Sequence, residues 1–159
     1  MPRRPRSSVF LEIFALSQAL RELLQSAMAG GPLTPVEYAF YSVVFDAEAV
    51  TPTEMAHQLS VPKTTVMEYV RLMEERGHAR RVTNPRDGRS YKLVLTASGL
   101  SAHRQAHDRF EVAYRSFLAA FPGDVTRAQA RLMRLRTAVT AAGRPAATGR
   151  LRSTRAAWS

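Results

Sequence analysis

Residues 51–99 read TPTEMAHQLSVPKTTVMEYVRLMEERGHARRVTNPRDGRSYKLVLTASG, and this stretch decides the fold. It opens on a capping box, in which the hydroxyl of Thr51 and the carboxylate of Glu54 satisfy free backbone N–H groups at a helix start. Pro52 suits the first helical position, because its φ is already helical and its missing N–H is not needed there. A short helix is therefore expected to run to about Leu59.

A turn and a second helix come next. Residues 60–62 (SVP) interrupt the first helix, and Gly77 ends the run that follows. Apolar side chains recur in that run at the spacing of one helical face, at Val66, Tyr69, Val70 and Met73. The side chains left pointing outward on the same helix are Lys63, Thr64, Thr65, Met67, Glu68 and Arg71. The order is therefore helix, turn, helix.

Two strand-like segments follow, at residues 79–83 (ARRVT) and 91–95 (YKLVL). The loop between them, NPRDGR at residues 84–89, is dense in turn formers and carries basic side chains. An α-helix fits the major groove of B-DNA, and a narrow basic hairpin can reach the adjacent minor groove or the phosphates. The spacing alone supports DNA reading and a merely solvated helix face equally well.

The residues of the hairpin favour DNA reading, because they resemble the MarR family of bacterial transcription regulators. That family's wing pattern is Asp-x-Arg, followed by an apolar strand and Leu-Thr-x-x-Gly. The matching residues here are Gly77, Arg81, Asp87, Arg89, Leu95, Thr96 and Gly99. The resemblance implies that Arg89 reaches DNA and that Asp87 orients basic neighbours through charge-assisted bonds. The predicted DNA-binding residues are Lys63, Thr64, Thr65, Met67, Glu68, Arg71, Arg86, Asp87, Arg89 and Ser90.

Two positions of the second helix depart from the family. Many members carry Ser, Thr or Asp where this chain has Pro62, which is expected to sit in the first helical turn without losing a hydrogen bond. Many also carry Arg where this chain has Glu68, and Glu prefers to accept from cytosine N4 rather than donate to guanine. The operator sequence of relatives is therefore not transferred to this chain.

Length and charge bound the function. A chain of 159 residues with 45% hydrophobic content is expected to form one domain with a real core. A net charge of +10 points to a polyanionic partner. Both ends are basic and lack acidic residues, so we expect mobile arms there, including a disordered tail over residues 144–159. The arm arginines are Arg3, Arg4, Arg6, Arg144, Arg150, Arg152 and Arg155.

Several function classes lose support. The chain has no cysteine, which excludes disulfides and thiol-based redox regulation. It has no glycine-rich phosphate loop and no Gly-x-Ser-x-Gly, so we predict that it is not an enzyme and needs no cofactor. Glu12 breaks the early apolar run, and no signal peptide or membrane span is expected, which predicts a cytoplasmic protein without a membrane partner.

Three rows of apolar side chains, which we call seams, lie outside the helix-turn-helix and hairpin. Their residues recur at alternating spacings of about four and three, which is typical of helices packed lengthwise on a partner. Thr96 and Asp124 are expected to cap the second and third of these helices, and the first begins near Ser7 or Ser8. The small helix-turn-helix and hairpin cannot cover three seams. We therefore expect a second copy of the chain to cover some of them, and the alternative is that they pack together in a bundle within one chain. The seam residues are Val9, Ile13, Leu16, Leu20, Leu23, Ala27, Leu100, His103, His107, Phe110, Tyr114, Phe117, Phe121, Val125, Ala128, Leu132, Leu135, Val139 and Ala142.

A second capping box, TPVE at residues 34–37, predicts a helix rich in aromatic residues. We expect an apolar ligand pocket between this helix and the seams, as in similar proteins, although such clusters are more often plain core. The pocket residues are Phe14, Tyr38, Tyr41, Phe45 and Phe110. His103 and His107 are spaced to share a metal, as in some relatives, but two ligands do not close a tetrahedral site, and no metal is predicted.

The sequence thus predicts a mainly α fold with a small β-hairpin wing. The winged-helix DNA-binding lobe spans residues 32–99, and the dimerisation helices span residues 7–29 and 97–143. The predicted function is a homodimeric transcription regulator that binds a palindromic double-stranded DNA operator and represses until a small apolar or aromatic effector releases it. The alternative is an unregulated or architectural DNA-binding protein.

Overall fold

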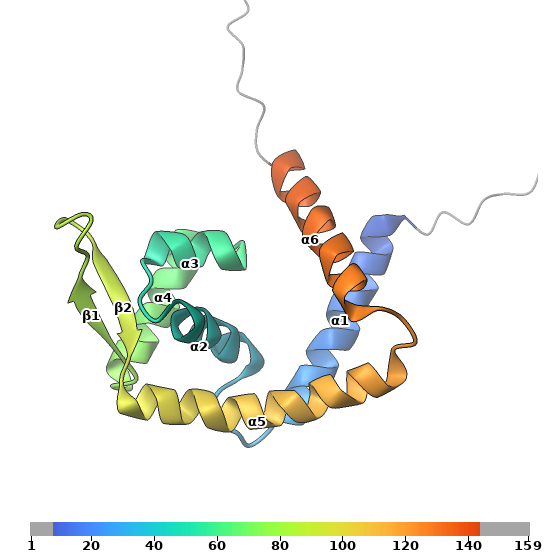
Figure 1. Cartoon of the computed structure of the whole chain (residues 1–159), viewed down its shortest axis with the longest axis horizontal. Helices are drawn as coiled ribbons and strands as arrows, with labels where there is room; N and C mark the ends of the chain where they lie inside the picture. The colour runs from blue at the N-terminus through green and yellow to red at the C-terminus, as the bar shows by residue number, and fades with distance from the viewer. Residues whose placement is uncertain (1–7, 144–159) are drawn as a thin grey trace, which may run out of the picture. The chain divides into compact units, whose positions relative to one another are not determined.

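The computed structural model describes residues 8–143, which hold six helices and one two-stranded antiparallel sheet (Figure 1). The elements are α1 (Val9–Met28), α2 (Pro35–Ala47), α3 (Pro52–Leu59), α4 (Lys63–Glu75), β1 (Ala79–Thr83), β2 (Tyr91–Leu95), α5 (Ala97–Ala120) and α6 (Val125–Ala142). The chain divides into two compact units after residue 120. Both predicted arms lie outside the described residues. Within residues 8–143, no helix is long and apolar enough to cross a membrane.

The helix starts follow the predicted caps. Thr34 and Thr51 both form complete capping boxes, and in the first of these the backbone N–H of Thr34 donates to Glu37 at 2.7 Å. The hydroxyl of Thr96 accepts from the backbone N–H of Gly99 at 3.2 Å, which caps α5 as expected. Pro62 differs from the prediction, because it lies at the N-cap position of α4 instead of inside the first turn. Helix α4, which we call the reading helix after its predicted role, therefore starts without a side-chain cap.

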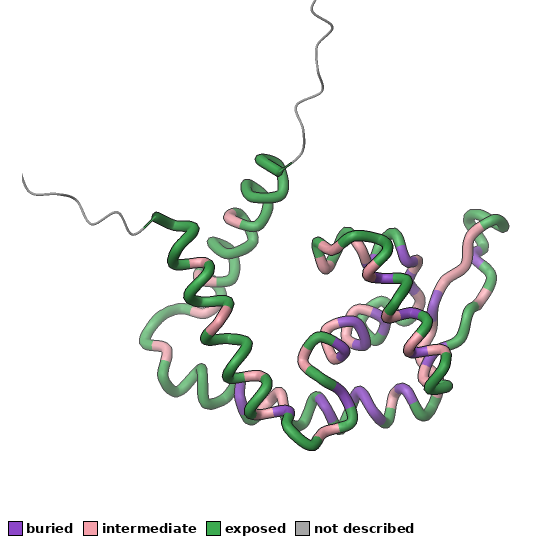
Figure 2. The backbone as a smooth tube through the Cα atoms, turned by 180° about the vertical axis from the view of Figure 1, so that it is seen from behind, coloured by how far each residue is buried: buried purple, intermediate pink, exposed green. Residues whose placement is uncertain are grey.

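The core of the first unit lies between α2, α3, α4, the hairpin and the first half of α5, where buried residues concentrate (Figure 2). The predicted inward face of α4 is confirmed, since Val66, Val70 and Met73 are fully buried. The hairpin joins this core through Leu93, whose backbone exchanges two hydrogen bonds with Val50. These contacts anchor the wing at its base and leave its tip in solvent.

Most residues of α1 and α6 are exposed (Figure 2), and several of the exposed ones are large apolar residues. On α1, Leu16 and Leu20 are at least 50% exposed, although the end of this helix packs on α5 and α2. On α6, which belongs to the second unit, no residue is buried, and Leu132 is 50% exposed. The predicted seams on α1 and α6 are therefore largely exposed, whereas the seam on α5 is buried at His103.

Candidate nucleic-acid interface and aromatic cluster

The outward face of α4 carries the side chains predicted to read DNA. Lys63, Thr64, Met67, Glu68 and Arg71 are exposed, and Thr65 is half-buried. Arg71 pairs with Glu75 at 3.3 Å, but both side chains are more than half exposed, so the pair restrains Arg71 only weakly. The face is available for contact, and the contact of these residues with DNA stays a prediction.

The tip of the wing is shaped by Asn84, a buried residue that sequence reasoning did not single out. Its amide nitrogen donates to the hydroxyl of Ser90 at 2.8 Å, and its amide oxygen accepts from the backbone N–H of Arg86 at 3.1 Å. Asparagine before proline is a known turn former, and this was the signal available in the sequence. Ser90 is thus held within the turn.

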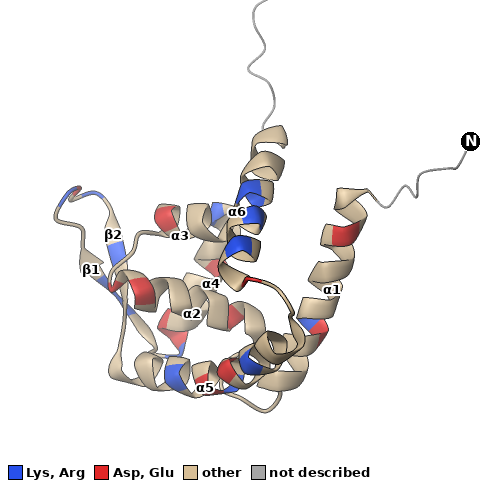
Figure 3. Ribbon diagram, turned by 45° about the vertical axis from the view of Figure 1, so that its right-hand side comes forward, with Lys and Arg blue, Asp and Glu red and all other residues tan. Residues whose placement is uncertain are grey.

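Asp87 folds the last part of the tip. Its carboxylate accepts from the backbone N–H of Arg89 at 3.1 Å, a bond that shapes the turn. Its role in orienting basic side chains stays a prediction. The side chains of Arg86 and Arg89 remain exposed, and Lys and Arg gather at the hairpin tip in Figure 3. Two exposed cations thus lie on a turn that is closed by several hydrogen bonds, which suits a phosphate or groove contact.

The C-terminal end of α4 is fixed to α2. Arg76 bonds Glu37 at 2.9 Å, and the Glu37 side chain is only 9% exposed. Burial works against the charge of Arg76, but the neighbouring Glu37 carboxylate outweighs it and raises the pKa of Arg76. The hydroxyl of Tyr41 bonds Nδ1 of His78 at 2.8 Å, and burial lowers the pKa of His78. One face of α2 therefore holds residues 76–78, which connect α4 to β1 and which we call the corner.

The same corner is held by the start of α5. The hydroxyls of Thr96 and Ser98 donate to the carbonyl of Gly77 at 2.7 and 3.0 Å. Gly77 has φ +66°, a conformation that favours glycine. Gly99 packs so closely on the corner that a Cβ there would collide with the carbonyl oxygen of His78. The family-like residues Gly77, Thr96 and Gly99 thus serve one tight junction.

An aromatic cluster joins α2 to α5 on a different face of α2. The ring of Tyr38 stacks on His103 with centroids 5.3 Å apart, and Phe45 stacks on His103 at 4.4 Å. Tyr38 also contacts Phe110 at 5.2 Å, and its hydroxyl bonds Nδ1 of His107 at 2.8 Å. The predicted pocket residues Tyr38, Phe45 and Phe110 are therefore brought together, with two histidines that were predicted as seam residues.

His103 is the buried centre of this cluster. It is 4% exposed, and its Nε2 atom bonds the hydroxyl of Ser42 at 3.1 Å. Its Nδ1 atom is buried and has no hydrogen-bond partner among the described residues. Burial first, and the nearby His107 second, lower the pKa of His103. A buried polar atom without a partner is costly, and it provides a place where a ligand atom can bond.

Two predicted pocket residues lie elsewhere. Tyr41 is about 100° around the helix from Ser42, so its ring turns toward His78 and the core. Phe14 lies on α1 and is 61% exposed, and no ring contact joins it to the cluster within residues 8–143. Helical spacing places Tyr41 at the edge of the cluster face, and only packing decides which way such a residue turns.

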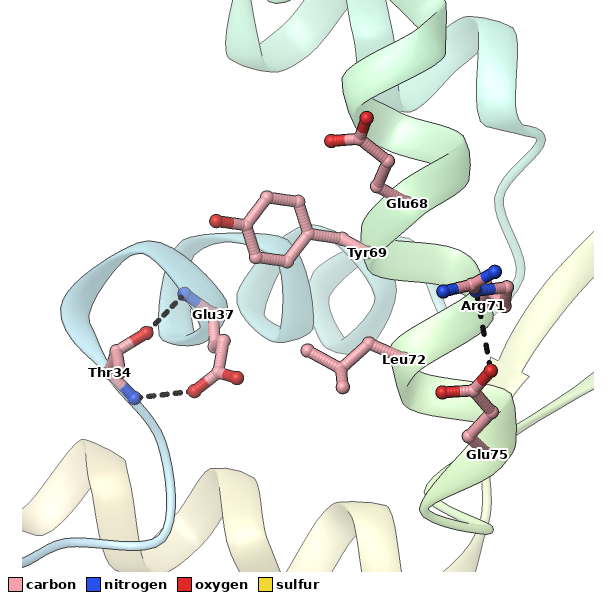
Figure 4. A pocket seen from close by; sticks show the side chains of 7 residues that line it. All are labelled: Thr34, Glu37, Glu68, Tyr69, Arg71, Leu72 and Glu75. Carbon is pink, nitrogen blue, oxygen red and sulfur yellow. Dashed lines mark hydrogen bonds and ion pairs between the residues drawn. The ribbon is translucent and has the colours of Figure 1, made fainter.

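Two hollows lie near these features. One of about 520 Å³ borders the cluster at Phe45, and its other lining residues are Val44, Asp46, Glu48, Leu95 and Leu100. Another of about 430 Å³ lies between the start of α2 and α4, lined by Thr34, Glu37, Glu68, Tyr69, Arg71, Leu72 and Glu75 (Figure 4). Within the described range, no three His, Asp or Glu side chains gather as metal ligands, and the rings of His103 and His107 stack 6.1 Å apart.

The helix-turn-helix, the basic wing and the long connecting helix define a class by fold: this chain has a winged helix-turn-helix fold, of the kind found in MarR-type regulators. Among solved structures it is similar to the PcaV transcriptional regulator from Streptomyces coelicolor, solved with its natural ligand, at 25% identity. The match covers 89% of this chain and 99% of that chain, with a TM-score of 0.71.

Two DNA complexes share the fold. One is a mutant MarR from E. coli with operator DNA, at 20% identity, covering 80% of this chain and 97% of that chain with a TM-score of 0.63. The other is the S. aureus MepR–DNA complex, at 14% identity, covering 82% of this chain and 98% of that chain with a TM-score of 0.69. No protein-family model and no curated protein matches the sequence.

Proposed function

We propose that this protein is a transcription regulator that binds a palindromic double-stranded DNA operator as a homodimer and leaves it when a small apolar or aromatic effector binds. The observation that carries the proposal is the exposed, largely polar face of α4 together with the two exposed cations of the wing tip. In the same fold, MarR is solved with operator DNA and PcaV with its natural ligand. The proposal assigns no catalytic activity and places the protein in the cytoplasm with the DNA.

The exposed apolar residues support a dimer. Leu16 and Leu20 on α1 and Leu132 on α6 are each at least 50% exposed, and large apolar patches of this kind usually bind a partner. A two-fold dimer presents two reading helices about 34–36 Å apart, which matches successive major grooves of a palindrome. We therefore keep residues 32–99 as the DNA-binding lobe and residues 7–29 and 97–143 as the dimerisation helices.

The contacts of α2 support ligand control. Tyr38 and Ser42 meet the histidines of α5, while Glu37 and Phe40 meet the end and the middle of the reading helix. A ligand that separates α2 from α5 would therefore also move α4. Because both heads must fit grooves one turn apart, a change of a few ångströms in their separation is enough to release DNA.

The rival function is unregulated DNA binding, and the polar content of the cluster argues against it. A plain core would be built from apolar side chains, whereas this one buries His103 with an unpaired Nδ1 atom. That atom gives a ligand a specific bond inside aromatic walls, which is the usual composition of a small-molecule site.

The test has two stages. In the first stage, wild-type protein selects duplexes from a random pool. Enrichment of one palindrome would support sequence-specific binding to an operator. The selected duplex is then titrated with benzoate, hydroxybenzoate and, as a matched control, acetate. We expect an aromatic acid to weaken DNA binding and Ser42→Trp, which fills the cluster beside His103, to remove that response. If the selection enriches no sequence, sequence-specific DNA binding is contradicted. If no aromatic compound weakens DNA binding, the unregulated DNA-binding protein is favoured.

A further inference from the structure

Four side chains connect the reading helix to the wing. The guanidinium of Arg81 on β1 donates two hydrogen bonds to the carboxylate of Glu74 on α4, at 2.7 and 2.9 Å. The same guanidinium lies over the ring of Tyr91 on β2, 4.3 Å from its centroid. The hydroxyl of Tyr91 in turn donates to the sulfur of Met67 at 3.7 Å. We call Glu74, Arg81, Tyr91 and Met67 the wing brace.

The brace touches the reading helix at two points. Met67 and Glu74 are seven residues apart, which is about 10 Å along an α-helix. On the hairpin, Arg81 pairs with Leu93 and Tyr91 with Thr83, so Arg81 and Tyr91 lie on one face. Two contacts separated along a helix hold its direction, whereas one contact would act as a pivot. The brace therefore sets the angle between α4 and the wing.

The charge of Glu74 calls for an explanation. A carboxylate on a helix that approaches phosphates opposes binding, so its presence lowers non-specific affinity. Its bond to Arg81 raises the pKa of that guanidinium. The two side chains are 50% and 27% exposed, and exposed pairs contribute little to folding stability. Neither attraction to DNA nor stability accounts for the pair, but a fixed two-bond geometry accounts for it well.

We propose that Arg81 is a positioning residue for sequence-specific binding: through Glu74 and Tyr91 it holds the wing at the angle that lets the reading helix and Arg89 engage adjacent parts of the operator together. This inference rests on the proposed DNA-binding function. Non-specific binding needs no such simultaneous fit, because it depends on phosphate attraction alone. The brace therefore acts on the ratio of specific to non-specific affinity.

A direct phosphate contact by Arg81 leads to different expectations. If Arg81 only attracted phosphates, Lys would replace it, and Glu74→Gln would tighten binding to every duplex by removing a negative charge. If Arg81 positions the wing, Lys fails because it lacks the planar fork that bonds Glu74 twice and stacks on Tyr91. Glu74→Gln then weakens specific binding even though the protein becomes more positive.

The experiment measures binding of the full chain to two probes, the duplex that wild-type protein selects and a random-sequence duplex of equal length. For Glu74→Gln and Arg81→Lys we expect about tenfold weaker binding to the selected duplex, with random-sequence binding equal or tighter. The matched control is Glu75→Gln, which removes the same charge one residue away. It also releases Arg71 from its exposed ion pair, so it should leave binding to both duplexes equal or tighter and should not weaken specific binding. Hydroxyl-radical footprints should lose the wing's protection before that of the reading helix.

Thermal unfolding without DNA separates positioning from folding, because all three variants should unfold near the wild-type temperature. Equal tightening of both duplexes by Glu74→Gln, or wild-type binding by Arg81→Lys, would overturn the brace. A wild-type protein that does not discriminate the two duplexes would instead overturn the proposed function. The two failures are distinct, since the second is read from wild-type protein alone.

Discussion

Phe40 of α2 stacks on Tyr69 of the reading helix, with ring centroids 4.1 Å apart and planes inclined by 17°. Phe40 is 2% exposed, so its ring is part of the core that supports α4. We expect Phe40→Ala to lower the free energy of unfolding by about 3–5 kcal/mol, because it removes a buried ring and leaves a cavity. Urea unfolding followed by circular dichroism measures it.

The control for that variant is Val36→Ala on the same helix, where the side chain is 53% exposed. Its effect should stay within about 0.5 kcal/mol, as for most surface substitutions. Equal losses for both variants would mean that the stack on Tyr69 does not support the helix.

Gly99→Ala tests the junction between α5 and the corner of the wing. The added Cβ would collide with the carbonyl oxygen of His78, which belongs to backbone and cannot swing away. We expect a loss of stability of about 1–3 kcal/mol or more from overpacking. Gly88→Ala adds the same methyl where no atom lies within 4 Å, and it should be nearly neutral in the same unfolding assay. A neutral Gly99→Ala would refute the close approach.

Arg89→Ala tests the wing tip. If Arg89 makes a groove or phosphate contact, its loss should weaken specific binding by about 1–3 kcal/mol without unfolding the protein. Arg104→Ala removes an equal charge from the exposed side of α5 and serves as the control. Fluorescence anisotropy at moderate salt compares the two, and equal affinities would remove Arg89 from the interface.

Glu68→Gln tests base reading by α4, where Glu68 is exposed and lines the hollow of Figure 4. A carboxylate accepts from cytosine N4, whereas an amide both donates and accepts, so base preference should change more than total affinity. Sequencing of the duplexes that each protein selects measures this. Identical profiles would show that Glu68 reads no base.

The buried His103 predicts a pH dependence of stability. Its pKa in the folded state lies below its ordinary value of about 6.5, because burial and the nearby His107 disfavour the charged form, against a weaker pull from Asp46. Just below pH of about 6.5, the imidazole of His103 therefore binds a proton more readily in the unfolded chain than in the folded chain. Stability is fully present above pH of about 6.5 and falls as pH drops below it.

His78 has a lowered pKa as well and adds to the same fall, since burial also disfavours its charged form. His103→Gln keeps an amide that can bond Ser42 but does not titrate, so its stability should depend less steeply on pH between about 5 and 7. Urea midpoints over a pH series measure both proteins, and parallel curves would show that His103 does not titrate with unfolding.

Local signals predicted most of the fold. The capping boxes at Thr34 and Thr51 fixed two helix starts, because each box is satisfied by atoms three residues apart. The turn formers of residues 84–89 separated the strands of the hairpin as expected. Such features depend on neighbours in the sequence, and one chain contains all that is needed to recognise them.

The contacts between different helices and strands could not be predicted from the sequence. Glu37 bonds Arg76 and Glu74 bonds Arg81 only because α2, α4 and β1 pack at particular angles, which periodicity does not specify. His103 belonged to a predicted seam, but its burial against Phe45 depends on how α2 lies on α5. Sequence spacing identified which faces are apolar, and packing decided which residues meet.

The division of α2 into two neighbouring faces has a consequence for redesign. Tyr38 and Ser42 line the aromatic cluster, but they alternate along the helix with Glu37 and Tyr41, which hold the reading head. An engineer who reshapes α2 to accept a new inducer would therefore disturb DNA recognition with it. The opposite wall is the safer place for a specificity library, because Phe110 contacts the cluster from α5, well outside the junction with the wing.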